Sequence, residues 1–196
     1  MSKSISLRFA LTSMLLAAAT ASQAHTGHGA HGLVEGLAHP FLGLDHLLAM
    51  VAVGLWSAIA LPVGRRLLGP GVFLAALLIG ALLSWEGVAL PAVESSVAAS
   101  VVLLGAMLFA GRHVPTSLGL TLVGAAALFH GYAHGSELAV GASAVAYAAG
   151  FMGATTLLHG VGLAAGVGLQ RLPDRVARLA ATVVGGAGVV MLAARL

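Results

Sequence analysis

The sequence predicts an all-α, polytopic membrane protein in which six transmembrane helices follow a cleaved signal peptide. Its 196 residues are 59% hydrophobic and 8% charged, whereas roughly 25% of the residues of a soluble domain are charged. After an N-terminal leader, the apolar residues fall into six stretches, each near or above the roughly 20 residues that a spanning helix needs. Between these stretches, arginine occurs only in alternate breaks, which is typical of a chain with a fixed orientation in the membrane.

Residues 1–24 have the features of a secretory signal peptide. Lys3 and Arg8 make the start basic, residues 9–19 are apolar, and Ser22-Gln23-Ala24 provides small residues for a cleavage site. The apolar part is about half as long as the roughly 20 residues of a spanning helix, which favours a cleaved signal over an anchor. We therefore expect the mature chain to begin at His25. An uncleaved signal anchor is the alternative.

The next segment, residues 25–36, is predicted to be a histidine-rich external tail, followed by a transmembrane domain over residues 37–196. His25, His28 and His31 recur at every third position, beside the terminal amine that cleavage would release. Histidine-rich tracts of this kind can capture metal ions. A flexible tail without a necessary function is the alternative interpretation.

Short breaks that contain proline, glycine or charged residues divide the transmembrane domain into its six stretches. The fifth stretch is longer than a span requires, so it has room for an external loop. Within it, Gly162 and Gly166 have the four-residue spacing that lets two helices approach closely in lipid. The predicted spans are residues 37–62, 67–90, 95–112, 116–136, 138–169 and 174–195.

The placement of arginine predicts the orientation of these spans. The first, third and fifth connections contain six arginines, and the second and fourth contain none. By the positive-inside rule the odd-numbered connections face the cytoplasm, and a cleaved signal independently places His25 outside. We expect a bacterial inner-membrane protein whose mature N-terminus is periplasmic. The arginines in question are Arg65, Arg66, Arg112, Arg171, Arg175 and Arg178.

The same composition excludes several functional classes. Without residues 1–24, seven arginines face six acidic residues, so the formal charge of 7 − 6 = +1 gives no indication of nucleic-acid binding. The chain has no cysteine, which excludes disulfides, thiolate metal sites and cysteine-based haem attachment. It also has no phosphate-binding Gly-Lys-Ser/Thr motif, so ATP cannot drive transport through this chain alone.

Two segments carry ionisable side chains in this apolar chain, where each is a candidate functional residue because burial is costly. In the fourth stretch, His130 and His134 are four residues apart, hence on one helix face and roughly 6 Å apart along the axis. Glu137 follows on that face. Gly131 and Gly135 leave space for an ion or a neighbouring helix. The pattern favours metal ligation over purely structural hydrogen bonds between helices.

The second such segment opens the first stretch with His39, Asp45 and His46. In an unbroken helix His39 and His46 would lie roughly 10 Å apart in height, too far to share one ion. Because Pro40 disfavours helical geometry at the residue before it, we expect the helix to begin near Leu42, with His39 folded back over the other two. Asp45 and His46 point about 100° apart, so one could ligate while the other orients a histidine.

Three residues outside these motifs are weaker candidates. Glu86, near the outer end of the second span, could complete a site or simply reach the interface. His159, within the fifth span, could be a second stop along a path or could bond to a neighbouring carbonyl. His25 belongs to the predicted external tail. Imidazole and carboxylate ligands without thiolate suggest a borderline divalent transition metal.

These motifs resemble those of the HupE/UreJ family of nickel and cobalt permeases, and the resemblance covers essentially the whole chain. The first-span pattern His-x5-Asp-His corresponds to His39, Asp45 and His46. The fourth-span pattern Phe-His-Gly-x-Ala-His-Gly-x-Glu runs from Phe129 to Glu137. The resemblance implies uptake of Ni²⁺ or Co²⁺, as substrate, for metalloenzymes such as hydrogenase and urease.

We therefore expect a secondary permease rather than an enzyme, with outward-facing metal ligands, no organic cofactor and no ATP. Because neutral imidazole is the ligand, uptake is expected to weaken below about pH 6.5. A membrane metalloenzyme or a haem-binding electron carrier using the same histidines is the alternative, although no His-Glu-x-x-His motif indicates a zincin-type protease. A channel for a small neutral molecule, gated by histidine protonation, is another.

Overall fold

A computed structural model describes residues 32–136 and 143–196, and these two ranges contain helices and turns but no strand. The predicted all-α class is therefore confirmed. The predicted signal peptide, His25 and Glu137 lie outside the described ranges. The α-helices are α2 (Leu33–Leu42), α3 (Leu44–Ala60), α4 (Leu68–Trp85), α5 (Val93–Ala110), α6 (Thr116–Ser136), α7 (Ala144–Leu169) and α8 (Asp174–Ala193), with short 3-10 helices η1 (Val63–Arg65) and η2 (Gly111–His113).

The long helices coincide with the predicted spans, although not all of them are clear membrane spans. By length and hydropathy, α4, α5, α7 and α8 can each cross a membrane, and the bent pair of α2 and α3 passes the same test together. This gives four candidate spans, or five with the bent pair, within the described residues. Helix α6 is 21 residues long, but it does not reach the same hydropathy because histidine, glycine and hydroxyl residues interrupt its apolar sequence.

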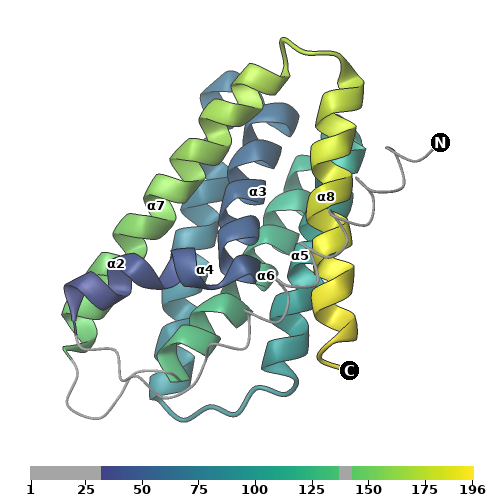
Figure 1. Cartoon of the computed structure of the whole chain (residues 1–196). Helices are drawn as coiled ribbons and strands as arrows, with labels where there is room; N and C mark the ends of the chain where they lie inside the picture. The colour runs from purple at the N-terminus through teal and green to yellow at the C-terminus, as the bar shows by residue number, and fades with distance from the viewer. Residues whose placement is uncertain (1–31, 137–142) are drawn as a thin grey trace, which may run out of the picture.

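The helices form a bundle in which α3 is flanked by α7 and α5, while α4 packs on α6 and α5 on α8 (Figure 1). Glycine makes the closest of these contacts possible. A Cβ at Gly131 would clash with the carbonyl oxygen of Leu77, and one at Gly162 would clash with the carbonyl oxygen of Val51. Gly131 therefore admits helix α4, and the pair Gly162 and Gly166 lets α3 and α7 pack tightly, as small residues do in lipid.

The first span is broken at Gly43, not at Pro40. Helices α2 and α3 meet at 84°, with Gly43 extended between them at φ −96° and ψ 114°. The prediction that His39 precedes the helix was wrong, because His39 and Pro40 both lie inside α2. Packing on α7 holds α2 helical past the proline: Gly36 sits against the backbone of Tyr147. Figure 1 shows α2 lying across the lower end of the bundle.

The arginine-bearing connections meet at one end of the bundle. Gln170, after α7, donates from Nε2 to the carbonyl of Ala58 at 2.6 Å and accepts from Arg66 at 3.2 Å. Arg112, after α5, donates to the carbonyl of Ile59 at 3.1 Å. The first, third and fifth connections are thus neighbours in space, as the predicted topology requires.

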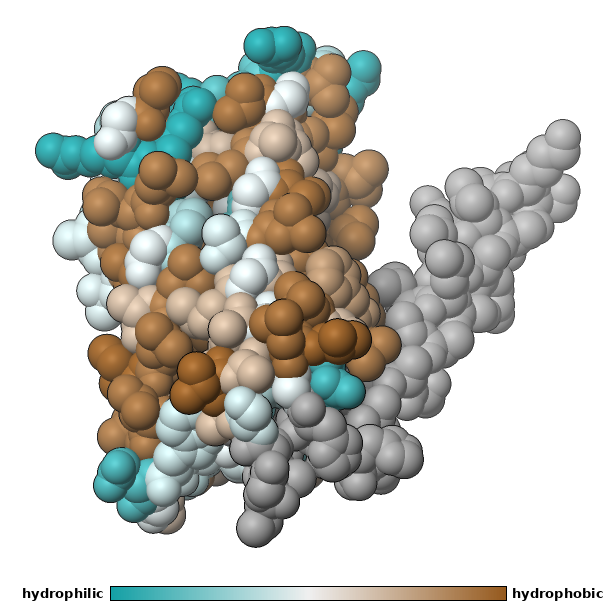
Figure 2. Space-filling view, turned by 90° about the vertical axis from the view of Figure 1, so that its left-hand side faces the viewer, coloured by the Kyte–Doolittle hydropathy of each residue, from teal (hydrophilic) through white to brown (hydrophobic). Residues whose placement is uncertain are grey.

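Between its two ends the bundle has an apolar outer surface. Figure 2 shows hydrophobic residues over most of one side, with hydrophilic residues towards the top and bottom. Ile79, Leu157 and Val183 are examples of large apolar side chains that are half exposed or more. Outward-facing apolar side chains of this kind are suited to contact with lipid tails rather than water.

Candidate functional site

Four histidine rings gather at the end of the bundle opposite the arginine-bearing connections. The ring centroids are 4.6 Å apart for His39 and His134, 4.3 Å for His134 and His46, and 4.6 Å for His46 and His130. Two imidazoles bound to one ion through nitrogen at about 2.1 Å would have centroids roughly 5 Å apart. We call these four residues the histidine cluster. The predicted pair on α6 and the predicted group around α3 therefore form one site.

The break at Gly43 explains how His39 joins this cluster. Because α2 turns across the end of α3, the ring of His39 comes within 6.2 Å of that of His46, although seven residues of straight helix would separate them by roughly 10 Å. A Cβ at Gly43 would lie 3.0 Å from side-chain atoms of Asp45 and His46. Glycine at this position therefore leaves room for the Asp45–His46 pair.

Asp45 is fully buried and orients His46. Its Oδ1 lies 2.6 Å from His46 Nδ1 and also accepts from the backbone N–H of His46 at 2.8 Å. A carboxylate only accepts, so Nδ1 carries the proton, and Nε2 then has the lone pair through which His46 could bind a metal. Of the two roles considered for Asp45 from the sequence, the geometry fits the orienting one.

The second carboxylate oxygen of Asp45 is held by Arg195, which lies outside both histidine segments. Arg195 Nη2 donates to Asp45 Oδ2 at 2.6 Å, and its Nη1 donates to the carbonyl of Glu94 at 2.9 Å. The Glu94 carboxylate lies 3.9 Å from the same guanidinium. Arg195 thereby ties the end of α8 and the start of α5 to the first turn of α3. Its position in the sequence could have indicated a special role, since Arg195 is the one arginine of residues 25–196 outside the odd-numbered connections.

His130 is oriented by Ser100 of α5, another residue that the sequence did not indicate. The Ser100 hydroxyl donates to the carbonyl of Val97 at 2.7 Å and lies 2.8 Å from His130 Nε2. Because the single hydroxyl proton is used, His130 Nε2 must donate, which leaves Nδ1 with the lone pair. His130 Nδ1 has no hydrogen-bond partner among the described residues, so it is the nitrogen that could ligate.

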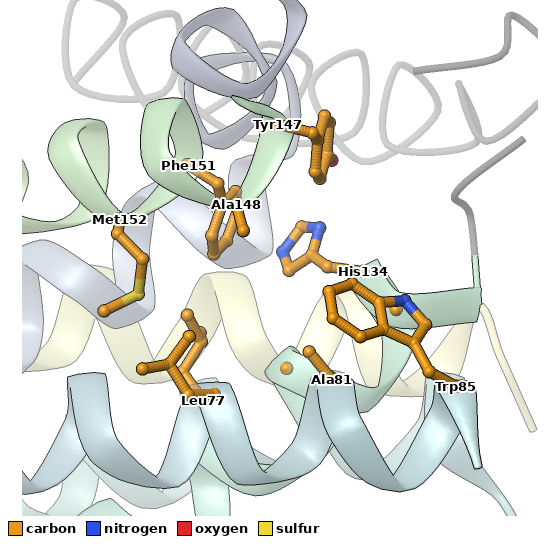
Figure 3. Close-up of a pocket in the computed structure, with 11 residues that line it drawn as sticks. Leu77, Ala81, Trp85, His134, Tyr147, Ala148, Phe151 and Met152 are labelled. Atoms are coloured by element: carbon orange, nitrogen blue, oxygen red, sulfur yellow. The ribbon is translucent and has the colours of Figure 1, made fainter. Parts of the chain in front are cut away.

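His134 forms part of a mostly apolar crevice between α4, α6 and α7. Figure 3 shows its ring between Tyr147 and Phe151 on one side and Trp85 on the other. The ring centroids of His134 and Phe151 are 3.9 Å apart. Aromatic walls of this kind keep water away from the ring and fix its position, while Trp85 remains 44% exposed at the outer surface.

The weaker candidates are not part of the histidine cluster. Glu86 is exposed where α4 ends, and no described residue forms an ion pair with it. His159 is 1% exposed within α7, and its ring lies 4.9 Å from Phe73, which in turn lies 6.0 Å from His130. Neither nitrogen of His159 bonds to a carbonyl or any other partner in the described ranges.

The chemistry of the histidine cluster is that of a nitrogen-rich site, which suits Ni²⁺, Co²⁺, Cu²⁺ or Zn²⁺ better than Mg²⁺ or Ca²⁺. Its rings contact one another edge to face, and within the described residues no three His, Asp or Glu side chains already form a coordination set. Binding an ion would therefore require the rings to turn. Asp45 and Ser100 already fix two of the four.

Most of the chain is similar to known proteins. A sequence profile of the HupE / UreJ protein family matches residues 12–191, a range that includes both histidine segments. Protein HupE from Rhizobium leguminosarum bv. viciae is 41% identical over 181 residues, which cover 90% of this chain and 93% of that protein. No solved structure gives a significant match.

Proposed function

This chain belongs to the HupE/UreJ family, and from that membership and the histidine cluster we propose that it is a secondary permease that takes up Ni²⁺ or Co²⁺. The family is associated with nickel and cobalt uptake for hydrogenase and urease. The metal ion is the substrate, and the proposed function needs no organic cofactor.

The observation that carries this proposal is the burial of three cluster imidazoles, those of His46, His130 and His134, in a bundle with an apolar outer surface. Polar groups inside such a bundle are costly to keep, and ring contacts alone do not require histidine. Nitrogen ligands for a transition metal do require it. The pairing of Asp45 with His46 adds the carboxylate that metal-binding histidines commonly carry.

We assign the following roles. His39, His46, His130 and His134 replace part of the water shell of the incoming ion. Asp45 positions His46 and contributes negative charge. Glu137, the next acidic residue after α6, lowers the electrostatic cost of bringing a cation to the cluster.

The proposed topology has six spans after a signal peptide, with α6 as the fourth and the bent pair α2 and α3 as the first. The arginine-bearing connections face the cytoplasm, and the histidine cluster opens to the periplasm. This orientation follows from the positive-inside rule. In the bacterial inner membrane, this orientation places the metal ligands on the side from which an ion arrives. It also places His25 in an external tail that could bind the ion first.

Nucleotide hydrolysis by this chain alone cannot drive uptake, since it has no phosphate-binding loop, which leaves facilitated diffusion or coupling to an ion gradient. Facilitated diffusion down a gradient, maintained by incorporation of the metal into enzymes, is sufficient for net uptake. The alternative of a haem carrier is less compatible with the cluster. Two axial histidines would have to stand on opposite sides of a porphyrin, whereas the rings of His46 and His130 are 4.6 Å apart and in contact.

The test is uptake of radiolabelled Ni²⁺ and Co²⁺ by cells that express the wild type, His46→Ala or His130→Ala at equal membrane levels. His113→Ala is the matched control, because His113 is exposed on η2 at the arginine-bearing end. We expect both cluster variants to lose uptake and the control to keep it. Unchanged uptake in both cluster variants would refute the site, and a wild type that takes up neither metal would refute the function.

A further inference from the structure

A second set of buried polar groups lies deeper in the bundle, beyond the histidine cluster. Tyr147, Phe151, Thr155 and His159 recur at every fourth residue of α7, so they share one helix face. The outer two contact the cluster, since the rings of Tyr147 and Phe151 lie 6.0 and 6.2 Å from that of His39. Thr155 and His159 continue the same face towards the arginine-bearing end. His159 is eight residues beyond Phe151, about 12 Å along the axis.

The side chains of both deeper residues are buried, and neither has a hydrogen-bond partner among the described residues. Thr155 is 0% exposed and His159 is 1% exposed. Neither the Thr155 hydroxyl nor either ring nitrogen of His159 has a partner in the part of the chain that the structure describes. Buried polar groups are nearly always hydrogen-bonded, and an unmet one destabilises the fold. A structural role through hydrogen bonding therefore does not account for His159.

Phe73 of α4 is a neighbour of both His159 and the cluster residue His130. Its ring lies 6.0 Å from that of His130 and 4.9 Å from that of His159, and it is fully buried. An ion that leaves His130 towards the arginine-bearing end would meet this ring first and the imidazole of His159 next. Farther along, Ser57 of α3 is another buried hydroxyl without a partner among the described residues.

We propose that His159, with Thr155, forms an inner binding position for the divalent transition-metal ion, occupied after the ion has left the histidine cluster. This inference rests on the proposed transport function. One imidazole and one hydroxyl bind such an ion more weakly than four imidazoles, so the ion keeps most of its water there. Such a position fits a transport path, because conduction needs several sites along the path and binding weak enough for the ion to leave.

The inner position predicts an unusual response to an apolar substitution. Replacing His159 by leucine removes a buried polar group that has no partner among the described residues, so no other group is left unpaired and the fold should be at least as stable. The same change removes the only nitrogen ligand of the inner position. Stability and transport should therefore respond in opposite directions, as they do at functional sites that cost stability.

The experiment compares the full-length wild type with His159→Leu, Thr155→Val and Leu158→Met, the last being a packing control at the adjacent buried residue. Three quantities are measured: initial ⁶³Ni²⁺ uptake by cells at equal membrane levels, equilibrium ⁶³Ni²⁺ binding to the purified protein, and its thermal unfolding temperature. For His159→Leu we expect unchanged binding by the cluster, an unfolding temperature no lower than that of Leu158→Met, and uptake reduced by roughly ten-fold or more. Thr155→Val should lower uptake in the same direction but less.

Two results would overturn the inner position. One is wild-type uptake by His159→Leu. The other is an unfolding temperature of His159→Leu clearly below that of Leu158→Met, since this would show that His159 supports the fold. Failure of the proposed function looks different, because the wild type itself would then take up neither Ni²⁺ nor Co²⁺.

Discussion

Substitution of Arg195 by methionine tests the link between the end of α8 and the histidine cluster. The change removes the guanidinium that lies 2.6 Å from Asp45 Oδ2. The Asp45 carboxylate, which is 0% exposed, then loses this charged partner. Breaking a buried ion pair in this way costs about 3–5 kcal/mol. Because the Arg195 side chain is 14% exposed, we expect the lower end, about 3 kcal/mol. For a chain of this size that corresponds to an unfolding temperature about 6–12 °C lower.

The assay is a double-mutant cycle with Asp45→Asn, measured by thermal unfolding of the purified proteins. Asparagine keeps an acceptor for His46 but carries no charge, so the double variant has no unpaired buried charge. Its loss of stability should be smaller than the two single losses added together, with a coupling of about 2 kcal/mol. Arg112→Met is the control, since Arg112 is exposed and its side chain donates to the Ile59 carbonyl rather than to a buried carboxylate.

Additive losses in this cycle would refute the pairing of Asp45 with Arg195. So would an Arg195→Met variant that is no less stable than Arg112→Met. Uptake provides a second measurement: since Asp45 orients His46, both single variants should transport Ni²⁺ more slowly than the wild type, whereas Arg112→Met should not.

Three further predictions concern packing, protonation and the limits of the site. Gly131→Ala should lower the free energy of unfolding by about 1–3 kcal/mol, because the added methyl would push α6 away from the Leu77 carbonyl. Gly160→Ala is the control and should not lower it, because a Cβ there meets no atom within 4 Å. Equal thermal stabilities of the two variants would contradict the close helix contact. Ni²⁺ uptake should fall as external pH is lowered, since protonated imidazole cannot ligate, and a rate that stays constant down to pH 5 would argue against histidine ligands. Glu86→Gln should transport at the wild-type rate, because Glu86 is exposed and outside the cluster; a large loss in the uptake assay would place it on the path.

Much of the fold follows from the sequence because lipid imposes a simple rule on helix length. The predicted fourth stretch, residues 116–136, coincides with α6, and the other long helices begin or end within a few residues of the predicted bounds. The break at Gly43 could not be placed in this way. Pro40 was the stronger local signal, but the packing of Gly36 on α7 is a contact between distant parts of the chain, which local propensity does not contain.

The candidate site was predictable in its ligands but not in its supporting residues. His130 and His134 stand out because imidazole is rare in apolar helices, and their spacing places them on one face. Ser100 and Arg195 support the cluster from α5 and α8, and neither belongs to a histidine motif. A serine in an apolar helix is common, so only the three-dimensional contact with His130 distinguishes Ser100 from other small polar residues.

The bend at Gly43 places His39 on a short arm beside α3. His39 is four residues from Gly43, about 6 Å in helical rise, so a swing of α2 by about 20° moves this residue by roughly 2 Å, close to the length of a metal–nitrogen bond. His46, His130 and His134 are carried by α3 and α6, within the bundle, and do not share that movement. His39 is therefore the one imidazole of the cluster whose distance from the other three depends on the bend at Gly43, which the packing of α2 on α7 holds in place.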